Sequence, residues 1–386
     1  TILFCTHIIN MNPYDFFEIL SVILASMLFS FAIAFPVIAL LYKFNITRRM
    51  TVDFTTLIEK RNLKVGVPIM GGLIIIITVL VLNLLFNPDK NPGLFLMLFV
   101  FLISALLGGF DDILNIYGRE RAKPKPISKV LKLIRVHKSR GKRILMIITL
   151  PWSAYKSFFF LLGSNPGKGI QAHEKILVQS IAGLALGVGF YFYSTNGALG
   201  QLEIPLFNSV ISLGILIIPF IWITVLLMTN AVNLADGMDA LAVSLLIPSF
   251  LAFLVIAIDK QDVRTVFLIS TIVGSLITYL YFNIPPARFQ MGDVGALAMG
   301  ALLAAVGFIL REPLLLLVIS LPFAVTLLSA VIQGIGRRIF GRRIFVMAPI
   351  HYHFQLSRDW GEEKVVMRFT LFAIVCAIVG LWIYFL

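Results

Sequence analysis

Hydrophobic residues occur along this chain in long runs that short polar segments separate. Most of the runs are near 20 residues, the length of a helix that crosses a membrane, whereas a β-barrel would show alternating segments of about 10. The pattern predicts an all-α, polytopic membrane protein that forms a single integral domain over residues 1–386. Ten spans are predicted, near residues 16–42, 68–86, 94–116, 176–194, 209–228, 240–258, 264–284, 295–310, 313–333 and 368–386.

The composition agrees with this class. Hydrophobic residues make up 59% of the 386 residues and charged residues only 13%. A soluble domain carries about 25% charged residues, so a soluble protein is excluded.

The orientation follows from lysine and arginine, which collect in cytoplasmic loops. If the chain starts outside, the inside segments hold 28 of the 32 Lys and Arg residues. The net charge of +13 then lies on the cytoplasmic face, where it suits anionic membrane lipids or a polyphosphate substrate. No nucleic-acid-binding module is visible, so nucleic acid is not an expected partner. The inside segments are 43–67, 117–175, 229–239, 285–294 and 334–368.

One cytoplasmic loop, at about 118–172, is long and strongly basic. Its residues 144–162 are apolar enough for an eleventh span, but an extra crossing would reverse the charge rule for every later loop. Interfacial residues favour a helix that lies at the membrane surface instead. They are Pro151, Trp152, Tyr155 and Lys156.

Five aspartates fall at cytoplasmic ends of the predicted spans: Asp111, Asp112, Asp236, Asp239 and Asp293. Carboxylates at membrane depth are costly, so they indicate function. Converging carboxylates call for a divalent cation and a phosphate-bearing substrate. The structural alternative is that each aspartate caps a helix end or pairs with a nearby lysine.

Asn233, Asp236 and Asp239 are spaced i, i+3 and i+6, which places them roughly on one helical face. Gly237 between them allows close approach of backbone or ligand. We therefore expect this short loop to contact a substrate or a metal.

His351 and His353 form a His-x-His pair in the last inside loop. Further soft ligands are absent nearby, so phosphate binding is favoured over metal ligation. Lys64 and Lys175 start inside spans, where a lysine either meets a phosphate or snorkels to the headgroups.

These polar groups come from five loops and share one membrane face, while the bilayer midplane is nearly free of charge. A transporter places its polar groups near the midplane. The arrangement favours an enzyme at the cytoplasmic interface, in a cleft that faces the cytoplasm. A transporter or a non-catalytic lipid-binding protein is the alternative.

Several stretches resemble the phospho-N-acetylmuramoyl-pentapeptide transferases, a branch of the polyprenyl-phosphate N-acetylhexosamine 1-phosphate transferase family. The resemblance covers roughly residues 60–116 and 173–386 and includes the ten-span layout. The histidine loop separates this branch from transferases that act on other sugars. The matching stretches are residues 64–72, 109–112, 233–239, 291–295, 349–355 and 360–369.

The resemblance implies a reaction of peptidoglycan synthesis in the bacterial inner membrane. Undecaprenyl phosphate attacks the sugar-linked phosphate of UDP-N-acetylmuramoyl-pentapeptide, giving lipid I and UMP, with Mg²⁺ as cofactor. A related transferase for another cell-surface glycan is the alternative within the family. A homodimer is one assembly that we consider.

The resemblance also implies residue roles. Asp293 would bind Mg²⁺, with Asp236 as a further ligand, and Asp111 or Asp112 would orient or deprotonate the lipid phosphate, with Asp239 in the same catalytic group. Asn233 and Asn283 would contact nucleotide or metal. Lysines and histidines would meet phosphates or uridine: Lys64, Lys175, His351 and His353.

The chain departs from the family pattern at four places. Asn115 stands where a lysine is usual, and we hypothesise that a basic residue of the long loop replaces the missing charge. The candidates are Lys123, Lys125, Lys129, Arg119 and Arg121, and an arginine would grip phosphate oxygens better. Gln290 stands where an aromatic residue usually stacks on uracil, so the adjacent Phe289 is expected to bind substrate. Tyr352 is the middle residue of a loop that usually has three histidines, and the loop at about 118–172 is unusually long.

Overall fold

The structure is a computed structural model, and it describes residues 13–47, 66–118, 127–162, 168–193, 201–204 and 209–386. Within these residues the chain is helical apart from one small hairpin, so the prediction of an all-α membrane protein is confirmed. Lys64 lies outside the described residues, as do four of the proposed substitutes: Arg119, Arg121, Lys123 and Lys125.

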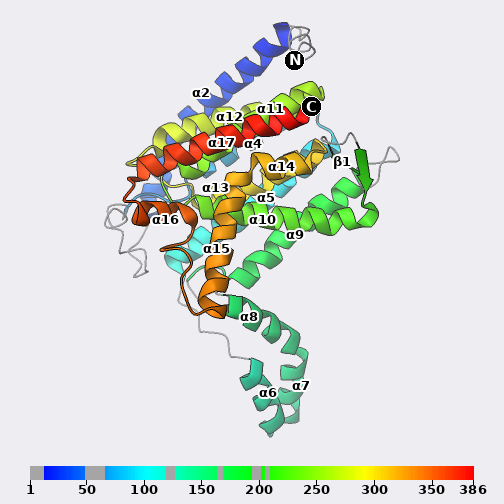
Figure 1. The fold of residues 1–386 in the computed structure, drawn as a ribbon, viewed down its shortest axis with the longest axis vertical. Helices are drawn as coiled ribbons and strands as arrows, with labels where there is room; N and C mark the ends of the chain where they lie inside the picture. Colours follow the sequence, from blue (N-terminus) through cyan, green and yellow to red (C-terminus); the bar gives the residue numbers. More distant parts are fainter. Residues whose placement is uncertain (1–12, 48–65, 119–126, 163–167, 194–200, 205–208) are drawn as a thin grey trace.

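In the first half of the chain, the described residues form three long or apolar helices, then a group of three shorter ones and then the long helix α9 (Figure 1). These elements are α2 (Pro13–Lys43), α4 (Leu73–Phe86), α5 (Pro92–Tyr117), α6 (Ile127–Val136), α7 (Arg140–Ile148), α8 (Leu150–Leu162) and α9 (Ala172–Tyr193).

The second half begins with an antiparallel pair of short strands, which the sequence pattern did not predict. The elements are β1 (Gln201–Ile204), β2 (Ser209–Ser212), η3 (Gly214–Leu216), α10 (Ile217–Ala235), α11 (Leu241–Asp259), α12 (Val263–Asn283), α13 (Gly292–Ile309), α14 (Pro313–Ile319), α15 (Leu321–Ile339), α16 (Ile350–Ser357) and α17 (Glu362–Tyr384).

Each of the ten predicted spans overlaps a helix, although the span near 209–228 also includes β2 and the span near 313–333 covers both α14 and α15. Among the described residues, eight helices are long and apolar enough to cross a membrane, or nine if α14 and α15 form one span. Those two helices meet at a bend of 75° beside Ser320. The remaining predicted span is α4, an apolar helix of only 14 residues.

Helix α13 lies at the centre of the bundle and packs against α5, α9 and α10. Its most apolar stretch is 83% buried, compared with 22% for α2, whose exposed apolar side chains face outward. The sequence of α13 is rich in glycine and alanine. Small residues allow helix backbones to approach closely inside a membrane, which explains the central position.

Hydrogen bonds between buried side chains join helices that are distant in sequence. Ser26 Oγ donates to the Thr271 carbonyl oxygen over 2.6 Å, which links α2 to α12. Asn83 Nδ2 of α4 donates to Thr271 Oγ1 over 2.8 Å. Such bonds satisfy polar groups that would otherwise be costly in an apolar interior.

Candidate active site

The site is built where two loops pair with each other at one end of the bundle, which we call the site face. The residues before α4 lie against those before α13: Gln290 N donates to Pro68 O over 2.9 Å, and Gly71 N donates to Gln290 O over 2.8 Å. A Cβ atom on Gly71 would lie 2.2 Å from a ring carbon of Phe289. Only glycine fits, and this pairing fixes the start of α13.

Asp112 at the site-face end of α5 holds the first turn of α13. Its carboxylate oxygens accept the backbone N–H groups of Asp293 over 3.1 Å and Val294 over 3.0 Å. Gly292 between the loop and the helix has a φ of +72°, and a Cβ there would lie 2.6 Å from Asp112 Oδ2. The Met-Gly-Asp sequence therefore has a glycine because backbone and carboxylate meet at that residue.

Lys175, near the start of α9, links the two carboxylates that the sequence analysis singled out. Its Nζ lies 2.6 Å from Asp111 Oδ2 and 2.5 Å from Asp293 Oδ2. Asn233 on α10 donates to the other oxygen of Asp293 over 2.7 Å. Residues from α5, α9, α10 and α13 thus meet around one ammonium group.

Asp111 is also held by the residues around it. Asn115, one turn further along α5, donates to Asp111 Oδ2 over 3.2 Å, and Ile170 N donates to Asp111 Oδ1 over 2.5 Å. The unusual Asn115 therefore lies in the site beside the catalytic candidate Asp111. The nearest basic group shown there is Lys175, from α9.

A second network surrounds Asp239 and Asn283. Asn283 accepts the Ala240 N–H over 2.8 Å and donates to the Phe289 carbonyl oxygen over 2.8 Å. Asp239 Oδ2 accepts the Ala287 N–H over 3.4 Å. These bonds connect the loop after α10 to the loop before α13, so both side chains shape the loops that border the Lys175 cluster.

The histidine loop packs onto the Asp236–Asp239 loop. The Tyr352 hydroxyl donates to the Gly237 carbonyl oxygen. A Cβ on Gly237 would lie 2.9 Å from His351 Nε2, so the glycine makes room for this buried histidine. His353 accepts the Val346 N–H at Nδ1 over 3.2 Å. Tyr352 therefore has a clear role where the family pattern has a histidine: it fastens one loop to another.

Asp236 ends α10 as its C-terminal cap, one turn after Asn233. Within the described part of the chain, no three His, Cys, Asp or Glu side chains form a group that could hold a metal by themselves. The two carboxylates that do converge are Asp111 and Asp293. A Mg²⁺ site with Asp236 and Asp293 as ligands therefore stays a prediction.

Phe289, which the sequence analysis expects to bind substrate, is packed inside the protein. Its side chain is fully buried, with ring centroids 5.1 Å from Tyr279 and 5.7 Å from Phe282. The ring fills the core beside Gly71, and its backbone oxygen rather than its face is used by the site. The sequence placed Phe289 and Gln290 beside the Met-Gly-Asp motif but did not show which of the two side chains points inward.

Three supporting residues were not singled out from the sequence. Glu362 at the start of α17 is buried and accepts the Asp239 N–H over 2.8 Å. Ser329 Oγ accepts the Ile350 N–H, and Gln333 of α15 binds backbone groups of Ile344 and Phe345. The available signal for Glu362 was its place in the stretch 360–369, which resembles the family pattern.

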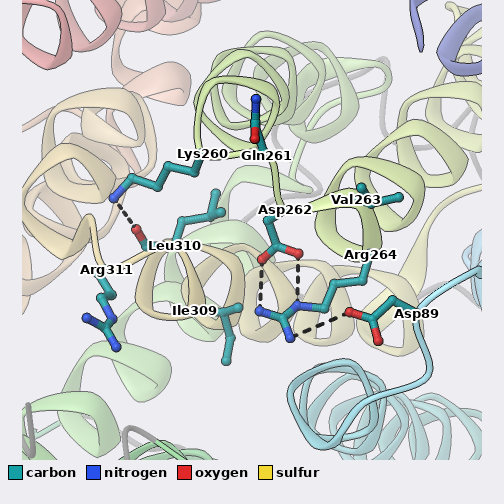
Figure 2. A pocket seen from close by; sticks show the side chains of 9 residues that line it. All are labelled: Asp89, Lys260, Gln261, Asp262, Val263, Arg264, Ile309, Leu310 and Arg311. Atoms are coloured by element: carbon teal, nitrogen blue, oxygen red, sulfur yellow. Dashed lines mark hydrogen bonds and ion pairs between the residues drawn. The ribbon is translucent and has the colours of Figure 1, made fainter. Parts of the chain in front are cut away.

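A hollow at the opposite end of the bundle is separate from this site (Figure 2). Lys260 donates to the Leu310 carbonyl oxygen over 2.7 Å, and Arg264 pairs with Asp262 over 2.8 Å. Helix α13 rises about 27 Å over its length, so the hollow lies about one membrane core away from Asp293. Its lining residues are Asp89, Lys260, Gln261, Asp262, Val263, Arg264, Ile309, Leu310 and Arg311.

Apolar spans around a cluster of carboxylates, an amide and a lysine at one membrane face define the class of a polytopic membrane enzyme. Comparison with known proteins makes the class specific. The model of glycosyl transferase family 4 matches residues 94–311, and the chain belongs to this family. The expected resemblance is thereby confirmed, as is the prediction that the protein is a transferase.

Three bacterial relatives carry the name phospho-N-acetylmuramoyl-pentapeptide-transferase. The protein from Enterococcus faecalis is 32% identical, with 84% of this chain and 86% of the relative covered. The one from Desulfotalea psychrophila is 33% identical, with 81% and 78% covered. The one from Caldanaerobacter subterraneus subsp. tengcongensis is 31% identical, with 83% and 84% covered.

Proposed function

We propose that this protein transfers phospho-N-acetylmuramoyl-pentapeptide from UDP-N-acetylmuramoyl-pentapeptide to undecaprenyl phosphate. A phosphate oxygen of the lipid attacks the sugar-linked phosphorus, the bond from that phosphorus to the bridging oxygen breaks, and UMP leaves with that oxygen. The products are lipid I and UMP. The shared name of the relatives supports the substrates.

The observation that carries the proposal is the meeting of Lys175, Asp111 and Asp293 at one membrane face. Phosphoryl transfer needs positioning and charge neutralisation more than covalent help from the protein. Lys175 supplies a positive charge for phosphate oxygens, and Asn233 orients Asp293 through its 2.7 Å hydrogen bond. We infer that this face is the cytoplasmic one, because the nucleotide substrate is soluble there.

The two neighbouring aspartates have different tasks. Both carboxylate oxygens of Asp112 accept hydrogen bonds from the backbone of α13, so Asp112 positions Asp293. Asp111 faces Lys175, Asn115 and Ile170 N, so its Oδ2 is the oxygen that would orient the lipid phosphate or take a proton from it. The different hydrogen-bond partners of the two carboxylates support this division of roles.

The donor set fits Mg²⁺. Mg²⁺ is usually bound by one or two carboxylates together with substrate phosphates. Carboxylate oxygens of Asp111 and Asp293 already converge on one cation, the Lys175 ammonium. Asp293 would hold the ion, with Asp111 and Asp236 as further oxygen donors. The ion would neutralise charge on the phosphates.

Release of UMP from purified protein tests this function. Polyprenyl phosphate is supplied with UDP-N-acetylmuramoyl-pentapeptide or with UDP-N-acetylglucosamine. We expect turnover only with the first. Turnover with the second alone would support the related transferase, and no UMP from any UDP-sugar would favour a non-catalytic protein.

The substitution Asp293→Asn tests the residue assignment in the same assay. The amide keeps the size of the side chain but removes the charge that Lys175 and Mg²⁺ require, so turnover should fall by about 10² or more across a Mg²⁺ titration. Asp89→Asn, at an exposed carboxylate at the other end of the bundle, is the matched control. Near-normal turnover of Asp293→Asn would remove Asp293 from the metal site.

A further inference from the structure

The helices α6, α7 and α8 form an arm that projects from the bundle (Figure 1). They pack on one another, and Arg143 Nη2 donates to the His137 carbonyl oxygen over 3.1 Å to close the turn between α6 and α7. Residues 127–162 contain no Asp or Glu. They contain eight basic residues: Lys129, Lys132, Arg135, Lys138, Arg140, Lys142, Arg143 and Lys156.

The arm combines these cations with exposed aliphatic side chains. Lys129, Lys132 and Arg135 follow each other at intervals of three on α6, so they share one face of that helix. On α7 the cations come first, and no residue of that helix is buried. Its aliphatic half is exposed by 51% to 69%: Ile144, Leu145, Ile147 and Ile148.

The combination of cations and aliphatic side chains on the arm favours one class of partner over the others. A nucleic acid or an acidic protein would neutralise the cations but would leave the aliphatic side chains in water. The interface of an anionic bilayer takes both, since headgroups meet the cations and the acyl boundary covers the apolar side chains. Trp152, with Lys156 Nζ 5.1 Å from its ring centroid, adds an aromatic residue of the kind found at membrane interfaces.

The contacts between α8 and α9 place the arm at the level of the lipid headgroups. The Tyr155 hydroxyl donates to the His173 carbonyl oxygen over 3.1 Å, and the rings of Trp152 and His173 are 5.3 Å apart. His173 is the second residue of α9, which is long and apolar enough to cross the membrane. The first turn of a spanning helix lies at the level of the headgroups. Helix α8 is therefore fixed at that level, on the site face.

We propose that the arm formed by α6, α7 and α8 is a binding element for anionic phospholipid headgroups that lies on the site face of the membrane. The proposal rests on the spanning bundle and on the surface of the arm. It does not rest on the proposed reaction, and no part of its test measures turnover.

The test uses the full chain in lipid nanodiscs. Cys5→Ser and Cys376→Ala remove the native thiols, and Leu145→Cys carries an environment-sensitive fluorophore on the arm. Ser357→Cys, an exposed position at the end of α16, carries the same label as a reference. Discs contain phosphatidylcholine alone or with phosphatidylglycerol, and brominated acyl chains report contact by quenching.

We expect the label at position 145 to be quenched at least about twofold more with phosphatidylglycerol than without it, and the label at 357 to respond equally in both. Raising the salt to about 1 M should reverse the difference, because charges are then screened beyond about 3 Å. Equal quenching at position 145 in both lipids would overturn the proposal, because it would show apolar insertion without headgroup recognition.

A matched pair of variants assigns the effect to the arm. Neutralising four arm cations to glutamine should remove the phosphatidylglycerol response, and neutralising four cations elsewhere on the site face should preserve it. Equal loss in both variants overturns the proposal. Protection of the label by single-stranded RNA, without a lipid response, would assign the arm to nucleic acid. The two sets are Lys138, Arg140, Lys142 and Arg143, and Arg337, Arg338, Arg342 and Arg343.

Discussion

Lys175 is the residue on which the charge balance of the site depends. It stands between two carboxylates, so Lys175→Gln would leave Asp111 and Asp293 without the ammonium group that pairs with both. We predict a fall in UMP release of about 10²-fold to 10³-fold, the usual cost of removing a group that stabilises transition-state charge. Lys168→Gln removes the same charge a few residues earlier and should change turnover little. Comparable losses in both variants would contradict this role.

Substitutions of Asp111 and Asp112 should affect the stability of the protein to different extents. Asp112→Ala leaves two backbone N–H groups at the start of α13 without their acceptor, which costs about 1–3 kcal/mol. We predict a lower unfolding midpoint in detergent for Asp112→Ala than for Asp111→Ala. In Asp111→Ala, Lys175 still forms its ion pair with Asp293. Asp112→Asn should recover part of the loss because it retains one acceptor oxygen. Identical midpoints for the two alanine variants would show that Asp112 is not the cap.

For single residues, the sequence indicated which residue types belong to the site but not where their side chains point. Asp111, Asn233 and Asp293 were recognisable because polar groups at span ends are costly without a purpose. Asn283 has the same signature, yet its amide bridges backbone groups of Ala240 and Phe289. A single sequence does not show which partner a buried amide finds, since the partner lies on another loop.

At the scale of elements, the contact between α5 and α13 decides how the site is assembled. A Cβ on Gly108 would lie 2.1 Å from the Asp293 carbonyl oxygen, which is backbone and cannot move aside alone. Gly108→Ala should therefore destabilise the protein by about 1–3 kcal/mol and lower turnover as Asp293 shifts.

The control is Gly141→Ala on α7, where a Cβ meets no atom within 4 Å. Alanine there should be neutral or stabilising by about 0.5–1 kcal/mol, because glycine is a poor helix former. Unfolding midpoints of the two variants, measured side by side, check the difference. Tolerance of Gly108→Ala would mean that α5 and α13 do not approach so closely.

Hydropathy predicted the helices well because a spanning helix must be apolar along its whole length. It did not predict the break at Ser320, since the apolar run continues through the bend and Pro322 is the only local signal. Strand β2 was assigned to the span near 209–228 for the same reason, because Val210 and Ile211 are apolar in either kind of element.

For the whole molecule, the charge asymmetry predicts that the arm and the site share one side of the membrane. Single cysteines at Ser139 in the arm and Ser357 beside the histidine loop should react with an impermeant reagent from the same side. A cysteine at Gln261, in the turn between α11 and α12, should react from the other. Labelling of positions 139 and 357 from opposite sides would add a crossing and refute the ten-span topology.

The path of the chain around the arm has a consequence of its own. A Cβ on Gly118, at the end of α5, would lie 2.6 Å from the carbonyl oxygen of Lys168. The excursion between these residues therefore departs from the bundle and rejoins it at the same place. We expect a shortened chain, with a brief glycine-serine bridge in place of 119–167, to keep its unfolding midpoint within about 5 °C. The arm is therefore an insertion in the transferase that could be gained, lost or exchanged without disrupting the helix bundle.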